Sequence, residues 1–227
     1  LMREEDTGRM ISLMGDAELD EGNIYEALIE GYKHELRNTW WIIDYNRQSL
    51  DSVTNERMFD RFEDIFKTAG WNVITLKYGK SQLAAFQKKG GESLRQWIDD
   101  CPNSLYSALA YKGGAAWRDR LTKELGDKPG VADLLAGYSD DELQGLMTNL
   151  GGHDIELLLE TFRSVSDDRP NCFIAYTVKG RGLPFQGHKD NHAGLMNNDQ
   201  MREFQKSMNV PEGAEWERFA GLEENQD

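Results

Sequence analysis

The chain has 227 residues, of which 39% are hydrophobic and 10% aromatic, and this composition predicts a folded protein with a substantial core rather than a disordered chain. Its 40 acidic residues against 26 Lys and Arg give a formal net charge of −14, which argues against nucleic acid and anionic membranes as main partners, because both would be repelled. No apolar run reaches the roughly 18 residues of a membrane span, and no secretory signal is visible. The two cysteines, Cys101 and Cys172, provide neither a disulfide framework nor a zinc cluster and are expected to be packing residues. We therefore expect a cytoplasmic protein without a membrane segment.

Strand and helix patterns alternate along the first third of the chain. The apolar run at 10–14 predicts a buried strand, apolar side chains at near-helical spacing predict a helix at 22–36, and 40–45 is a second strand candidate. A helix at 55–69 and a third strand at 72–76 continue the order. This alternation is typical of parallel strands joined by right-handed crossovers. The predicted fold is α/β, with a mostly parallel sheet and helices on both faces.

The second part of the chain is predicted to be mainly helical. Residues 80–150 have apolar side chains at helical spacing, and 153–165 form an amphipathic helix. A fourth strand is predicted at 172–178, and a short helix at 200–208. Between them, glycines and a proline interrupt 179–195, which predicts a long loop of the kind that often carries function.

Polar residues follow the first two predicted strands. Gly15-Asp16-Ala17-Glu18 ends the first strand, and Asn46-Arg47-Gln48 follows the second. In a parallel sheet both segments lie at the carboxyl edge, where open α/β folds bind ligands. A carboxylate and an amide oxygen that meet there can hold Mg²⁺ against a diphosphate. On spacing alone, two simple turns are the more common explanation of these residues.

The predicted late loop adds a lysine and two histidines. Lys179 follows the fourth strand, so it should reach the same edge, where its charge suits a phosphate group. His188 and His192 have the spacing of zinc ligands on a helix, but the surrounding residues argue against a helix and no further ligands are evident. A loop histidine can instead donate a proton in catalysis, although a solvated loop residue is the simpler interpretation.

Five segments in order resemble one enzyme family. MGDAELDEGNIYEAL and NRQSLD resemble the GDG…N thiamine diphosphate motif of the transketolase-like superfamily. Together with FEDIFKTAGWNVITLKYG, LGGHDIELLLETF and AYTVKGRG, they are most similar to the homodimeric pyruvate dehydrogenase (acetyl-transferring) first component. The segments follow the family's order at similar separations across most of residues 10–205.

The resemblance implies roles for individual residues. Asp16 and Asn46 would bind Mg²⁺ through side-chain oxygens, and Gln48 through its backbone carbonyl. His192 would be the catalytic loop histidine that assists substrate handling and reductive acylation of the lipoyl group. Ala17 departs from the motif, because the family has glycine there. The residues implied to lie at the cofactor are Gly15, Asp16, Ala17, Glu18, Asn46 and Lys179.

The resemblance also implies an activity for a parent protein. That activity is thiamine diphosphate- and Mg²⁺-dependent decarboxylation of a 2-oxo acid, most simply pyruvate, by a homodimer that acetylates the lipoyl domain of a dihydrolipoyl acyltransferase. Residues 1–182 would be a diphosphate- and Mg²⁺-binding domain portion, incomplete at its N-terminus, with a helical insertion at about 80–150. Residues 183–227 would be an active-site-type loop and a C-terminal helical extension.

Family enzymes have further segments, so we expect this chain to be a fragment or a split subunit without turnover by itself. Two other interpretations remain open from the sequence. One is a transketolase, which transfers two-carbon ketol units. The other is a non-catalytic relative that acts as a binding or assembly module.

Overall fold

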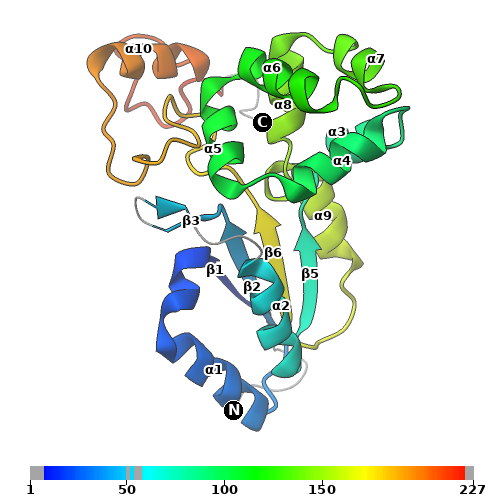
Figure 1. The fold of residues 1–227 in the computed structure, drawn as a ribbon. Helices are drawn as coiled ribbons and strands as arrows, with labels where there is room; N and C mark the ends of the chain where they lie inside the picture. Colours follow the sequence, from blue (N-terminus) through cyan, green and yellow to red (C-terminus); the bar gives the residue numbers. More distant parts are fainter. Residues whose placement is uncertain (1–7, 50–51, 54–57, 223–227) are drawn as a thin grey trace.

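The computed structural model describes residues 8–49, 52–53 and 58–222. Within this part of the chain, the main sheet has four strands in the order β1-β2-β6-β5 (Figure 1), and every pairing in it is parallel. The α/β fold with a mostly parallel sheet is therefore confirmed. A separate antiparallel pair, β3 with β4, follows β2 and was not foreseen from the sequence. The strands are β1 (Met10–Gly15), β2 (Thr39–Tyr45), β3 (Gln48–Ser49), β4 (Ser52–Val53), β5 (Asn72–Leu76) and β6 (Asn171–Tyr176).

Helices cover both faces of the main sheet, as the alternation of side chains along β2 shows. Ile43 and Tyr45 belong to a core cluster that includes residues of α1 (Gly22–Lys33) and α2 (Met58–Thr68). Trp40 and Ile42, which occupy the alternate positions of the strand, belong to a second cluster, against which α9 (Ile155–Ser164) packs. Because successive side chains of a strand point to opposite faces, the two clusters lie on opposite sides of the sheet. The predicted two-sided covering is therefore correct.

Helices also fill the chain between β5 and β6, beside the carboxyl end of the sheet (Figure 1). Trp117 is completely buried there, and its ring lies 5.0 Å from that of Tyr106. Neither of the two buried cysteines, Cys101 and Cys172, forms a disulfide. The helices are α3 (Lys80–Phe86), α4 (Gly91–Asp100), α5 (Asn103–Lys112), α6 (Gly114–Leu125), α7 (Val131–Ala136) and α8 (Asp140–Thr148), and α10 (Asn198–Ser207) follows β6.

The first strand differs from its prediction. Met10, Ile11 and Leu13 of β1 are 69%, 55% and 74% exposed, so the prediction of a buried strand is wrong. The physical reason is position, because among the described residues β1 is at the edge of the sheet and has β2 as its one neighbouring strand. The α9 cluster reaches Trp40 and Ile42 of β2 and does not extend to β1.

Candidate functional site

The loops that follow β1 and β2 lie side by side at the carboxyl edge of the sheet. Gly15 at the end of β1 is in register with Asp44 of β2. Asp16 begins a short 3₁₀ helix that runs to Asp20, and its Oδ2 accepts the backbone N–H of Arg47 at 2.8 Å. The structure therefore brings Asp16 against the loop that contains Asn46 and Gln48.

Burial changes the acidity of Asp16. Its side chain is almost inaccessible, with 3% exposure. The pKa of Asp16 is raised to about 6, mainly by burial and in smaller part by the charge of Asp44, while the hydrogen bond from the Arg47 N–H opposes the rise. A cation bound beside this carboxylate would offset the cost of burying its charge.

The two other predicted metal ligands are fixed by local and long-range hydrogen bonds. The Asn46 Oδ1 accepts the backbone N–H of Gln48 at 3.0 Å, which leaves one lone pair of this oxygen for another partner. The buried Gln48 side chain donates from Nε2 to the carbonyl of Gly187 at 3.2 Å. This bond joins the loop after β2 to the loop after β6, a role for the Gln48 side chain that the sequence did not suggest.

The motif position that lacks glycine does not require glycine in this structure. Ala17 lies inside the 3₁₀ helix and is not among the described non-glycine residues with positive φ. Its neighbour Glu18 is exposed, and its Oε1 accepts the backbone N–H of Gly15 at 3.3 Å. A Cβ added at Gly15 would meet no atom within 4 Å, so space remains around this turn.

The loop after β6 folds back on its own beginning. The carbonyl of Lys179 accepts the Gly187 N–H at 2.9 Å and the Asn191 Nδ2 at 3.0 Å. His192 is exposed, and within the described part of the chain it makes no hydrogen bond or ion pair with the Asp16 and Asn46 loops. Its role as a catalytic residue therefore stays a prediction. His188 lies between two turns, with its ring 4.7 Å from that of Tyr111.

Arg47 has a role in this site that the sequence analysis did not assign to it. Its backbone has φ +66, a left-handed conformation that costs a side chain-bearing residue on the order of 1 kcal/mol or more. The side chain is buried, and its guanidinium lies 4.4 Å from the ring centroid of Tyr106 in α5. Arg47 thereby connects the loop after β2 to the helices between β5 and β6 by a cation–π contact. Sequence offers no signal for it, because an arginine in a polar loop is normally solvated.

His153 fixes the end of β6. It closes the Gly151–His153 3₁₀ turn before α9, and its Nε2 accepts the backbone N–H of Val178 at 2.7 Å. Burial lowers the pKa of His153 to about 4, and the charge of Arg181 contributes. The ring is therefore neutral at pH 7, with an acceptor on Nε2 directed at the residue before Lys179. The sequence analysis placed this histidine at the start of the predicted helix 153–165 and gave it no function, whereas the structure places it in the turn before α9.

The depressed pKa of His153 predicts a specific loss of stability in acid. An unfolded histidine takes up a proton near pH 6.5, whereas the native side chain does so only near pH 4, so the unfolded state binds more protons between these values. We expect the free energy of unfolding to fall by about 1–2 kcal/mol more in the wild type than in His153→Gln between pH 7 and pH 4.5, after allowance for partial exposure. Urea unfolding at both pH values measures this difference. Equal losses in the two proteins would contradict the prediction.

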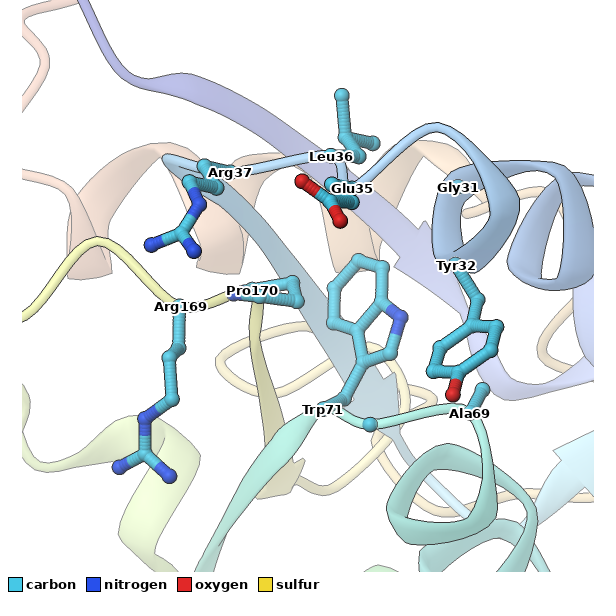
Figure 2. Close-up of a pocket in the computed structure, with 10 residues that line it drawn as sticks. Gly31, Tyr32, Glu35, Leu36, Arg37, Ala69, Trp71, Arg169 and Pro170 are labelled. Atoms are coloured by element: carbon cyan, nitrogen blue, oxygen red, sulfur yellow. The ribbon is translucent and has the colours of Figure 1, made fainter.

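A surface pocket lies at the other end of the sheet. Its lining residues, which Figure 2 shows, come from the end of α1 and from the loops that precede β2, β5 and β6 at the amino edge. None of the predicted site residues lines it. The cofactor-type residues and this pocket are therefore separate features of the fold.

Comparison with known proteins by sequence finds relatives that share one name. No family model matches the chain. The pyruvate dehydrogenase E1 component of Escherichia coli K12 is 30% identical over 207 residues, which cover 88% of this chain and 23% of that protein. The corresponding component of Cupriavidus necator H16 is 29% identical over 209 residues, covering 88% of this chain and 22% of that protein. Among solved structures, transketolase from Campylobacter jejuni aligns with a TM-score of 0.45 and 16% identity, over 88% of this chain and 20% of that chain.

The sequence matches confirm the resemblance stated from the five motif segments. The aligned region covers most of this chain but less than a quarter of either E1 component. The chain is therefore a relative of the pyruvate dehydrogenase E1 components that matches one portion of them.

Proposed function

We propose that this chain forms the diphosphate- and Mg²⁺-binding portion of a thiamine diphosphate-dependent 2-oxo acid dehydrogenase. The observation that carries the proposal is the contact between Asp16 and the Asn46–Gln48 loop at the carboxyl edge of the sheet. Open α/β folds bind ligands at this edge. The relationship to pyruvate dehydrogenase E1 components supports the same assignment.

The residues at this edge fit the proposed group. Within the described residues no cluster of three His, Cys, Asp or Glu is arranged to hold a metal, so Mg²⁺ would depend on mixed oxygen donors. Asp16 would supply a carboxylate, Asn46 its amide oxygen and Gln48 its backbone carbonyl, and Mg²⁺ prefers such hard oxygen ligands. The buried carboxylate with its raised pKa is the feature that a cation would stabilise most.

Around the ion, each residue would have a limited task. Gly15, Ala17 and Glu18 would border the diphosphate, and Lys179 would offset its negative charge. Gln48 and His153 would hold the loop after β6 in place through their hydrogen bonds to Gly187 and Val178. When bound, thiamine diphosphate would supply the carbanion stabilisation that 2-oxo acid decarboxylation requires.

The wider proposal concerns the parent enzyme. It would be a homodimer that decarboxylates pyruvate and acetylates the lipoyl domain of a dihydrolipoyl acyltransferase, with His192 serving that transfer. Within the described residues, no helix is long and apolar enough to span a membrane. A cytoplasmic location stays a prediction.

Isothermal titration calorimetry tests the cofactor proposal directly. Thiamine diphosphate with Mg²⁺ should bind the chain, and Asp16→Ala should weaken this binding by roughly 100-fold or more, because it removes a charged metal ligand. Asp20→Ala, which changes an exposed carboxylate of the same 3₁₀ helix, is the matched control and should bind like the wild type. Equal affinity of Asp16→Ala and the wild type would overturn the proposal. A second assay uses the intact parent protein. Activity with pyruvate and a dye acceptor would indicate a dehydrogenase, whereas activity with a ketose phosphate would indicate a transketolase.

A further inference from the structure

The pocket of Figure 2 lies at the end of the sheet opposite to Asp16. The strand β2 has seven residues, so the two edges are about 20 Å apart. The cavity volume is about 260 Å³, below the roughly 300–1,000 Å³ of sites for drug-sized molecules, so its size fits a small ligand. Its apolar lining comes mainly from Tyr32, Leu36, Ala69, Trp71 and Pro170.

The charges around the pocket do not balance. The Arg37 Nη1 pairs with the Asp168 Oδ1 at 3.0 Å, and the Arg169 Nη2 pairs with the Asp167 Oδ2 at 2.9 Å. Both arginines that line the pocket are therefore neutralised by aspartates. Glu35 also lines the pocket, and within the described part of the chain its carboxylate has no ion-pair partner. The uncompensated charge of the pocket is negative.

Backbone geometry holds Glu35 in this place. Its φ is +51, in the left-handed region that a glutamate rarely adopts. The Glu35 N–H donates to the carbonyl of Tyr32 at 3.2 Å, and the Leu36 N–H donates to Gly31 at 2.9 Å, which fixes the turn after α1. Figure 2 shows the Glu35 carboxylate directed toward the ring of Trp71.

Two aromatic rings form the walls beside this carboxylate. Trp71 is only 6% exposed, and its ring lies 4.9 Å from that of Trp41 and 5.6 Å from that of Phe66, so it is rigidly held. The exposed Tyr32 ring passes over Gly70, where an added Cβ would lie 3.5 Å from it. Aromatic faces and a carboxylate both attract a cation, and together they select a cation that also has an apolar body.

We propose that this pocket binds a small organic ammonium cation, with its charge beside Glu35 and its alkyl groups between Tyr32 and Trp71. The net charge of −14 favours the approach of such a ligand from solution. The site does not share a residue with the proposed cofactor site, so either proposal can fail without the other.

A titration with choline, at constant ionic strength, tests the proposal. The readout is the indole N–H signals in ¹H–¹⁵N spectra, with the signal of Trp71 assigned from Trp71→Phe. We expect a saturable shift of this signal with Kd on the order of 1 mM, and affinity at least about 5-fold lower for 3,3-dimethylbutan-1-ol, the neutral analogue of the same shape. Absence of saturation, or equal binding of the neutral analogue, would overturn the proposal.

Matched variants distinguish direct attraction by the Glu35 carboxylate from attraction by the overall negative charge of the protein. Glu35→Gln should weaken choline binding by about 5-fold or more, and Tyr32→Leu by a similar factor, because each removes one attraction for the cation. Glu26→Gln removes the same charge from an exposed position of α1 that does not line the pocket, and it should leave the affinity unchanged. An equal loss in Glu26→Gln and Glu35→Gln would show a long-range charge effect only and would contradict the proposed site.

Discussion

Replacing Asp16 by Asn is expected to stabilise the metal-free protein at pH 7 and to abolish the proposed binding of Mg²⁺ with thiamine diphosphate. Burial raises the pKa of Asp16 from 3.8 to about 6, so at pH 7 the native state holds a charge that the unfolded chain carries more easily. Removing that charge should raise the free energy of unfolding by about 2–3 kcal/mol. Asparagine keeps an oxygen that can accept the Arg47 N–H, so the loop contact is retained.

The pH dependence of the gain in the free energy of unfolding shows whether the buried charge of Asp16 causes it. As the pH falls through 6 toward 4, native Asp16 becomes protonated in the wild type, and the advantage of Asn should disappear. Urea unfolding at pH 7 and pH 4, with and without Mg²⁺, measures the effect. Added Mg²⁺ and thiamine diphosphate should stabilise only the wild type at pH 7. Exposed Asp20→Asn is the control, and a destabilised Asp16→Asn at pH 7 would show that burial is not the dominant influence on this carboxylate.

Local patterns in the sequence were sufficient to place the strands of the main sheet. The segment 40–45 became β2 (Thr39–Tyr45), and 72–76 became β5 (Asn72–Leu76), because β-branched and aromatic residues between turn residues specify strands locally. The exposure of β1 was not predictable in this way. An apolar run reads the same at the edge of a sheet as at its centre, and only the strand order β1-β2-β6-β5 decides between them.

The candidate site was predictable where topology alone brings residues together. Asp16 and Asn46 follow adjacent parallel strands, so their loops had to lie at one edge. Arg47 and His153 could not be placed, because their partners are distant in sequence. The Arg47 guanidinium contacts Tyr106, and His153 accepts from Val178, and both contacts depend on how the helices between β5 and β6 settle on the sheet.

Gly151→Ala is expected to lower the free energy of unfolding by about 3 kcal/mol and to weaken cofactor binding, because this glycine packs against backbone. A Cβ at this position would lie 2.4 Å from the carbonyl oxygen of Leu76 and 2.5 Å from its carbon. Backbone atoms of β5 cannot move aside without breaking the strand, and the Gly151 N–H also donates to the carbonyl of Lys77 at 3.0 Å. The turn that carries His153 would have to shift, and with it the hydrogen bond to Val178.

Gly145→Ala provides a control that distinguishes close packing from a general effect of glycine replacement. Gly145 lies exposed within α8, and an added Cβ meets no atom within 4 Å. Alanine should therefore raise the free energy of unfolding by about 0.5–1 kcal/mol through its higher helix propensity. Urea unfolding of both variants measures the expected opposite changes in the free energy of unfolding. Calorimetry of thiamine diphosphate with Mg²⁺ then measures the effect on cofactor binding. If the free energy of unfolding of Gly151→Ala lies within about 0.5 kcal/mol of the wild-type value, the prediction is wrong. The close packing of this turn against β5 would then not be needed to hold the site in place.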